Sequence, residues 1–315
     1  MHGPHQLRRS AADEGFIVVA ALWILAALAT LALVYSAYVA QSAIALRVND
    51  GAVQTEALMA SSLELVAYQL SSPVAEQRPT RGAFRFRPGR ADVAVEFMSE
   101  AARIDLNAAP KGLIAGLFAV LGAPPAAAEQ YATRVIGWRT PPKPNAQDPN
   151  VQDQDEDAIY RTAGLAYSPR RAPFNHVAEL WLVQGLPPAL VERALPFVTV
   201  YSGMPDINVL DAPAEVIAAL PGMSPDRLTA FLGQRETMTP DPQMVAAALG
   251  GDQKGITTKG SNAIRVRTRI AFDDGRRTTS DVVILIGGTD DPYRVLSWQG
   301  DIDASSGTSL MAGDR

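Results

Sequence analysis

The longest apolar run of the chain lies near its first residue. Between Phe16 and Ala40 no side chain carries a formal charge, and the polar ones are a threonine, a serine and two tyrosines. A helix of about 20 apolar residues crosses the hydrocarbon core of a bilayer. Arg8 and Arg9 precede the run, and the positive-inside rule then places the N-terminus in the cytoplasm. Residues 16–40 are therefore predicted to be a transmembrane helix, with everything after Arg47 across the membrane.

Helical spacing of apolar residues continues beyond this segment to Leu70, where two serines and a proline end it. Alternating apolar and polar positions then predict a hairpin around a Pro-Gly dipeptide. From Pro110 to about Ala248 the spacing is helical, and after that alternation returns. The predicted strands are Phe84–Arg87, Asp92–Met98, Ala263–Phe272, Thr278–Ile286 and Tyr293–Trp298.

The simplest fold for this order of elements belongs to the α+β class. A long N-terminal helix packs on a small antiparallel sheet, and an inserted all-α domain of about 140 residues, a usual domain size, interrupts the sheet. Arg265, Arg267 and Arg269 share one face of a predicted strand, opposite apolar neighbours. Because alternation predicts polar residues on the outer face, we expect these arginines to be solvated.

Three segments of the insertion repeat a short helix, a glycine turn and a second helix, the parts of a helix-hairpin-helix. They read LFAVLGAPP, LWLVQGLPP and VIAALPGMSP, with the turn at Gly122, Gly185 and Gly222. This motif often binds DNA through backbone N–H groups of its turn, but Pro124 and Pro187 have none. A packing role is therefore favoured over DNA binding.

A second repeat, RIDLNAAP and DINVLDAP, places an apolar pair before Asn107 and before Asp211, with a proline soon after. Both segments are predicted to start helices capped by these two side chains.

The composition limits the partners and the catalytic groups that the chain can have. The formal net charge is -5 with no block of lysines, which disfavours nucleic acid as a partner. No cysteine is present, so disulfides and thiolate chemistry are excluded. Of three histidines only His176 lies in the folded body, where we expect a surface or capping residue rather than a catalyst.

An acidic segment, QDPNVQDQDEDAIY, is predicted to form a proline-flanked loop in the insertion. Alternating aspartates there resemble the first half of an EF-hand loop, but the glycine and the glutamate that complete such a loop are absent. Two interpretations stay open, a solvated acidic loop and a calcium site that relieves repulsion among the carboxylates. The candidate ligands are Asp153, Asp155, Glu156 and Asp157.

The start of the apolar run also carries a motif. A cleavable secretory signal is one interpretation, but cutting at the small residues near Ala40 would place a tyrosine three residues before the bond. Gly15-Phe16, between a basic leader and an uncharged helix, instead resembles a type IV prepilin cleavage site. The resemblance implies that a prepilin peptidase cuts after Gly15 and that the new amine of Phe16 is methylated. Most pilins and pseudopilins carry glutamate at the fifth mature position, which here is Ala20.

Three features together resemble the minor pseudopilin K (GspK) family of type II secretion systems. They are the missing glutamate, the large helical insertion and the segment FNHVAELWLVQGLPPALVERALPFVTVYSG. The resemblance implies a non-catalytic subunit at the tip of a short pseudopilus, in complex with minor pseudopilins I and J. That subunit starts assembly and contributes to protein export across the outer membrane. It is a single-pass protein of the inner membrane with its body in the periplasm. The family also implies calcium in the helical domain, near Gly137-Trp138 and Tyr160.

On this resemblance we expect the following boundaries: a prepilin leader at 1–15, the transmembrane helix at 16–40, the pseudopilin helix and first strands at 41–109, the inserted α-helical domain at 110–250, the C-terminal strands at 251–300 and a disordered tail at 301–315.

The residues alone leave two other functions open. One is a membrane-anchored DNA-binding protein that uses the helical hairpins. The other is an anchored periplasmic hydrolase with the acidic loop as its metal site.

Overall fold

The computed structural model describes residues 11–71, 78–141, 153–251, 253–287 and 291–300. The chain divides into two units, Met1–Leu58 and Met59–Arg315. Most of the predicted leader and the whole predicted tail at 301–315 lie outside the described residues.

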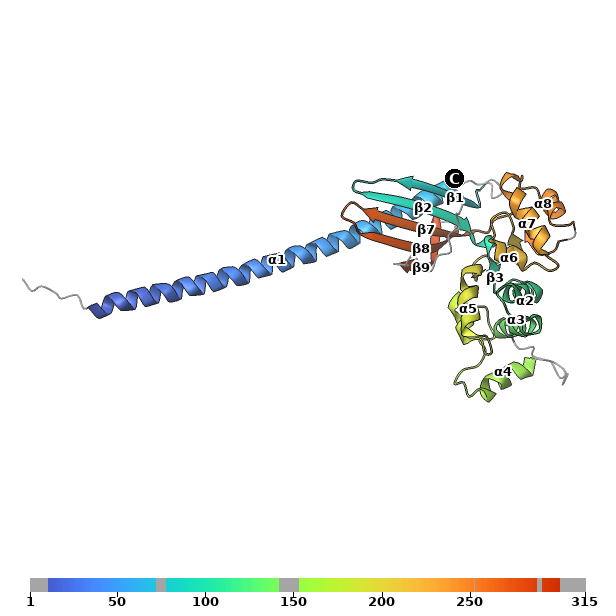
Figure 1. The fold of residues 1–315 in the computed structure, drawn as a ribbon, viewed down its shortest axis with the longest axis horizontal. Coiled ribbons are helices and arrows are strands. Elements are labelled where there is room, and N and C mark those ends of the chain that lie inside the picture. The colour runs from blue at the N-terminus through green and yellow to red at the C-terminus, as the bar shows by residue number, and fades with distance from the viewer. Residues whose placement is uncertain (1–10, 72–77, 142–152, 252, 288–290, 301–315) are drawn as a thin grey trace, which may run out of the picture. The chain divides into compact units, whose positions relative to one another are not determined.

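Helix α1 spans Ala11–Gln69, 59 residues, so the predicted long helix is confirmed (Figure 1). Within the first unit, Val18–Val39 has a mean hydropathy of 2.4 and none of it is buried. The Thr30 hydroxyl donates back to the Ala26 carbonyl at 2.7 Å, which satisfies a polar group inside the apolar stretch. By length and composition, this is the one helix of the described chain that could cross a membrane.

In the second unit, the last turns of α1 pack against the sheet. Leu63, Val66 and Leu70 are buried at helical spacing, on one face of the helix. The Tyr293 hydroxyl of strand β9 donates to Glu64 Oε1 at 3.3 Å on the same segment. The predicted contact between helix and sheet is therefore present within this unit.

Five antiparallel strands form the sheet in the order β1-β2-β7-β8-β9 (Figure 1). Their bounds are Arg81–Phe86, Ala91–Ser99, Ala263–Phe272, Arg277–Ile286 and Tyr293–Gly300. The predicted strands are thus confirmed, and β7 has the bounds that alternation predicted. In β2, Val93, Val95 and Phe97 point into the core at the two-residue period of a strand.

The insertion between β2 and β7 has a hydrophobic core of its own, in which Phe118, Tyr160 and Phe231 are fully buried. Two short parallel pairs, β3 with β4 and β5 with β6, lie inside it. The expectation of an all-α insertion is therefore wrong in this detail. The elements in chain order are η2 Glu100–Ala102, β3 Ile104–Asp105, α2 Lys111–Val120, α3 Pro125–Arg139, α4 Asp153–Thr162, η3 Val177–Leu182, α5 Pro188–Ala194, η4 Leu195–Phe197, β4 Val198–Thr199, β5 Ile207–Asn208, α6 Ala214–Ala218, α7 Pro225–Gln234, η5 Arg235–Thr237, α8 Pro242–Ala248 and β6 Ile256–Thr257.

The repeat RIDLNAAP/DINVLDAP forms two similar turns, each running from a short strand into a helix. Asp105 accepts two backbone N–H bonds from the turn after β3, and Asn208 accepts one from the turn after β5. Helices α2 and α6 begin after prolines, with no side-chain cap. The predicted caps Asn107 and Asp211 are therefore wrong, because the side chain at the end of each short strand already organises the turn.

An arginine closes each of these turns from the far end of the helical segment. Arg139, the last residue of α3, donates to the carbonyls of Leu106 and Ala109. Arg235, just after α7, donates to the carbonyl of Ala212 at 2.6 Å. Both Ala109 and Ala212 immediately precede the proline of their repeat, so the two repeats share this long-range contact as well as their sequence.

Glycine turns join the repeated helices. Gly122, Gly185 and Gly222 have φ values of +93°, +88° and +75°. Residues other than glycine rarely adopt φ values in this positive range, which explains the glycine in all three segments.

Gly116 of α2 lies against the backbone of Ala219, the residue that follows α6. A Cβ built there would lie 2.0 Å from the Ala219 carbonyl oxygen, whereas one at Gly112 of the same helix would meet nothing within 4 Å. We expect Gly116→Ala to lower the free energy of unfolding by about 1–3 kcal/mol through overpacking. Gly112→Ala should leave that free energy unchanged or raise it by up to about 1 kcal/mol. Urea denaturation of the full chain in detergent measures both, and equal effects of the two substitutions would contradict the close approach.

Candidate functional site

The chain passes from the sheet into the insertion after Ser99 and returns to the sheet before Ala263. These two crossings lie side by side. The Ser99 side-chain oxygen accepts the backbone N–H of Ser261 at 2.8 Å, and the two serine hydroxyl oxygens are 3.2 Å apart. Glu100, the first residue of η2, is therefore held where the sheet ends and the insertion begins.

A buried network of charges surrounds Glu100, which is only 1% exposed. Arg265 Nε donates to Glu100 Oε1 at 2.7 Å, and Arg265 Nη2 donates to Oε2 at 3.2 Å. The Thr199 hydroxyl of β4 donates to the same carboxylate. Arg265 Nη1 reaches Asp281 of β8 at 2.7 Å, and Arg267 donates to the other Asp281 oxygen at 3.1 Å. The insertion is thus joined to β7 by the bidentate contact of Arg265 with Glu100, and Arg265 extends the network to Asp281 of β8.

The local electrostatics favour the ionised form of both acids. Burial alone would raise the pKa of Glu100, but Arg265 and Arg103 hold that pKa below its ordinary value. Burial would likewise raise the pKa of Asp281, but Arg265 holds that pKa below its ordinary value. The network is therefore charged at neutral pH, and both acids depend chiefly on Arg265 of β7.

A second ion pair links the sheet to the insertion. Arg81, the first residue of β1, lies 3.5 Å from Asp211 in the turn after β5. Asp211 also accepts a hydrogen bond from Asn208 at 2.8 Å. Burial raises the pKa of Asp211, against the effect of Arg81 and Arg235.

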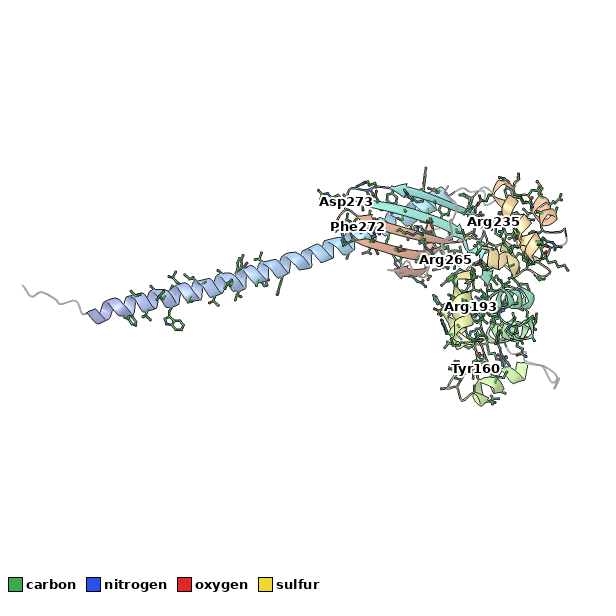
Figure 2. All side chains as sticks on the ribbon, viewed as in Figure 1. Tyr160, Arg193, Arg235, Arg265, Phe272 and Asp273 are labelled. Atoms are coloured by element: carbon green, nitrogen blue, oxygen red, sulfur yellow. The ribbon has the colours of Figure 1, made fainter. Side chains whose placement is uncertain are left out.

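The basic face predicted to be solvated is only partly so. Arg269 is 52% exposed, as expected, but Arg265 and Arg267 are 17% and 19% exposed. The prediction is wrong for these two because Glu100 and the insertion cover their end of β7. Arg265 lies at that end of the strand, and Phe272 lies at the other (Figure 2).

The predicted processing residues lie in helix α1. Phe16 is 75% exposed and Ala20 is partly exposed, with no carboxylate at the Ala20 position. Cleavage after Gly15 and methylation of Phe16 stay predictions.

The acidic segment is a helix from Asp153 onward, α4, rather than the predicted loop. A helix turns about 100° per residue, so alternate aspartates do not share a face. The Asp153 and Asp155 side chains lie outside the described residues, as does Asp148. Among the residues with described positions, no three histidine, aspartate or glutamate side chains are grouped to hold a metal ion. Calcium therefore stays a prediction.

The two described candidate ligands both meet arginines. Glu156 Oε2 accepts from Arg134 at 2.8 Å, and Asp157 lies 3.3 Å from Arg171. Glu156 Oε1 is buried with no hydrogen-bond partner in the described part of the chain. Gly137 makes room for this carboxyl group, since a Cβ there would lie 2.9 Å from its Cδ.

His176 acts as a cap. Its side chain accepts the backbone N–H of Ala178 at 3.1 Å at the start of η3. The expectation of a surface or capping histidine is confirmed.

Known proteins share this architecture. A chain in the crystal structure of the GspK-GspI-GspJ complex from the enterotoxigenic Escherichia coli type 2 secretion system is similar in fold, with a TM-score of 0.55. The likeness covers 81% of this chain and 98% of that one, at 20% sequence identity. No curated protein matches the chain. Residues 98–203 match the model of the family described as type II secretion system (T2SS), protein K.

This region belongs to the type II secretion protein K family. The resemblance inferred from the sequence is confirmed, and the family and fold together indicate a type II secretion pseudopilin. The protein K region includes Glu100, Arg103 and Thr199, but not Arg265 or Asp281. The charge network therefore joins the protein K region to strands that follow it in the chain.

We expect Glu100→Gln to lower the free energy of unfolding at pH 7 by about 3–5 kcal/mol, because Arg265 loses a buried partner. The folded-state pKa of Glu100 is lowered from 4.5, so its contribution is present above pH 4.5 and is lost as the pH falls below that value. Urea unfolding between pH 7 and pH 3 should therefore show a steeper acid loss for the natural chain than for the variant.

Glu129→Gln is the matched control. Glu129 is exposed and pairs with Lys111 at 3.1 Å on the surface, so its removal should change the free energy of unfolding by less than about 1 kcal/mol. Equal effects of the two substitutions would contradict the role given to Glu100.

Proposed function

We propose that the chain is a minor pseudopilin that caps the tip of a type II secretion pseudopilus. It starts pseudopilus assembly together with minor pseudopilins I and J, and so contributes to protein export across the outer membrane. Its apolar helix anchors it in the inner membrane in a single pass, with the N-terminus cytoplasmic and the body periplasmic. The proposal assigns it no catalytic role.

The observation that carries the proposal is the insertion between β2 and β7. It has its own hydrophobic core and enters and leaves the sheet at one end. In a shaft, every subunit is stacked at a fixed spacing between neighbours, so each copy would have to accommodate this domain. A terminal subunit has no neighbour beyond it, and the space is free.

The Ala20 position supports the same conclusion. In a pilin shaft, a carboxylate at this position neutralises the amine of the adjacent subunit inside the membrane, where an unpaired charge is costly. A subunit without that carboxylate offers no partner to a further amine. This suits an end position.

The similar structure is that of a GspK-GspI-GspJ complex. That assembly supports I and J as the partners of this chain. The prepilin peptidase enters the proposal through Gly15-Phe16, and the membrane through the length and hydropathy of Val18–Val39.

The glycine-turn repeats serve packing in this proposal, rather than DNA binding. In the turn between α2 and α3, Gly122 and Ala123 donate their N–H groups to carbonyls of α2 at 3.0 and 2.9 Å. Pro124 and Pro125 follow and have no N–H. Four successive residues therefore offer no free N–H to a phosphate.

In membranes that contain the prepilin peptidase and pseudopilins I and J, we expect the chain to begin at Phe16 with a methylated amine. Detergent extraction should recover it as a single copy in a complex with I and J. Intact mass spectrometry measures the N-terminus, and native mass spectrometry counts the subunits. Gly15→Val should leave Met1 uncleaved, whereas Ala11→Val, four residues before Gly15, should be processed normally.

Two results would contradict the proposal. A start near Gln41 would indicate a cleaved secretory signal and no anchor. Many copies along an isolated pseudopilus would identify a shaft subunit.

We further propose that the acidic segment binds calcium. The observation that favours it is Glu156 Oε1, a buried carboxylate oxygen without a partner among the described residues, and calcium is bound through oxygen ligands. The Arg134 and Arg171 ion pairs oppose it, because each competes with a cation for a carboxylate. Calcium here would serve stability, by holding α4 to α3.

Calcium at about 100 times its dissociation constant should raise the melting temperature of the chain by about 5–10 °C. Differential scanning calorimetry in detergent, with and without a chelator, measures the shift. Glu156→Gln should abolish the calcium-dependent shift, whereas Glu129→Gln should retain it. If calcium does not change the melting temperature of the natural chain, the proposal is overturned.

A further inference from the structure

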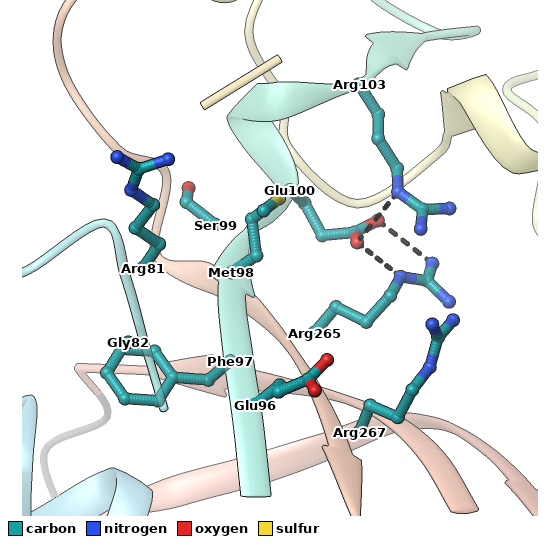
Figure 3. Close-up of a pocket in the computed structure, with 10 residues that line it drawn as sticks. All are labelled: Arg81, Gly82, Glu96, Phe97, Met98, Ser99, Glu100, Arg103, Arg265 and Arg267. Atoms are coloured by element: carbon teal, nitrogen blue, oxygen red, sulfur yellow. Dashed lines mark hydrogen bonds and ion pairs between the residues drawn. The ribbon is translucent and has the colours of Figure 1, made fainter. Parts of the chain in front are cut away.

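A hollow that is open to solvent lies where the sheet meets the insertion. Arg81 of β1 lines it and is paired with Asp211 at 3.5 Å. Three more guanidinium groups line one side: Arg103 follows η2, and Arg265 and Arg267 come from β7. Figure 3 shows these three side chains in one column on the same side of β2, with the Glu100 carboxylate reaching between Arg103 and Arg265. Each of the three is less than a fifth exposed.

The three cations share two buried acids. Asp281 holds Arg265 and Arg267 at 2.7 and 3.1 Å, and Glu100 holds Arg265 at 2.7 Å. Glu96 also lines the hollow, but its carboxylate is paired with Arg269 at 2.8 Å. One positive charge of the column is left without an acid of its own.

That charge belongs to Arg103. Its one ion pair within the described residues joins Nε to Glu100 Oε1 at 3.9 Å, beyond hydrogen-bond distance. Burial and the neighbouring Arg265 lower the pKa of Arg103 to about 10, whereas Glu100 and Asp281 raise the pKa of Arg265. The guanidinium is therefore paired less closely than those of Arg265 and Arg267, and part of it is exposed to solvent.

We propose that this hollow binds a carboxylate side chain on an acidic segment of a partner protein, with Arg103 as the principal donor. A guanidinium presents parallel N–H groups that match the two oxygens of a carboxylate. One excess charge suits a monoanion, and the carboxylates of Glu96 and Glu100 repel a dianion such as phosphate.

The occupant is a protein segment rather than a free small acid. One ion pair does not offset the translational and rotational freedom that a free small acid loses on binding. A segment adds contacts along the mouth of the hollow, which β1, the outer strand on this side of the sheet, also lines. The inference does not depend on the proposed place of the chain in a pseudopilus.

The test uses the full chain in detergent with three capped pentapeptides, Ala-Ala-X-Ala-Ala, in which X is glutamate, glutamine or phosphoserine. NMR signals of the arginine Nε–H groups report binding at individual side chains. We expect the glutamate peptide to shift the Arg103 signal and to bind at least tenfold more tightly than the other two.

Arg103→Gln should weaken the glutamate peptide at least tenfold. Arg87→Gln is the matched control, because Arg87 is an exposed arginine of the β1–β2 hairpin region that pairs with Asp273 at 3.2 Å, outside the hollow. It should leave the affinity unchanged. If Arg103→Gln does not fold, Arg103→Lys is the second variant, because it keeps the charge but loses the planar pair of N–H donors. It should weaken binding severalfold while the circular dichroism spectrum stays native.

Four results would overturn the proposal. They are no shift of any arginine signal with the glutamate peptide, equal affinity for the glutamine peptide, equal or tighter binding of the phosphoserine peptide, and unchanged affinity in both Arg103 variants.

Discussion

The buried ion pair between Glu100 and Arg265 determines how the sheet and the insertion are joined. Glu100 is the first residue after β2, and Arg265 lies near the start of the strand by which the chain returns. Their contact therefore spans both crossings at once. Removing two charges from water is unfavourable unless geometry and further hydrogen bonds compensate. Thr199 and Asp281 provide that compensation, one from the insertion and one from the sheet.

Beyond this junction, the insertion is built from local units that satisfy their own backbone. Each short strand leads through a turn into a helix, and Arg139 or Arg235 returns from the far end to the carbonyl before the proline. Carbonyls at such turns lack helical partners, and a charged donor satisfies them well. In the glycine turn between α2 and α3, the N–H groups of Gly122 and Ala123 likewise bond to carbonyls of the chain itself.

Periodicity predicted the elements well where one face of each is buried. β7 has its predicted bounds, and the long helix ends within one residue of the predicted end, because alternation and helical spacing directly record burial. The acidic segment was different. A cluster of carboxylates is typical of a loop, but acidic residues in a first turn also favour a helix start through the helix dipole, and α4 begins at Asp153.

The charge network lay mostly beyond sequence reasoning. Glu100 and Arg265 are separated by 165 positions, and no local pattern links them. One part of it carried a signal: a hairpin centred on Asp274 places Arg267 directly opposite Asp281, as the strand register shows. Tracing that register would have indicated that Arg267 is paired rather than solvated. The cover that the insertion places over Arg265 is tertiary, and alternation along one strand does not record it.

The hydrogen bond between Ser99 and Ser261 shows that the insertion is attached to the sheet at one place. Because the insertion departs and rejoins at neighbouring points, with Ser99 opposite Ile264 in register, a tight connection there would close β2 and β7 as an ordinary hairpin. The sheet does not need the insertion to set its strand order. The helical region is therefore modular: replacing it as a whole by a tight turn would leave the pairing of β2 with β7 intact.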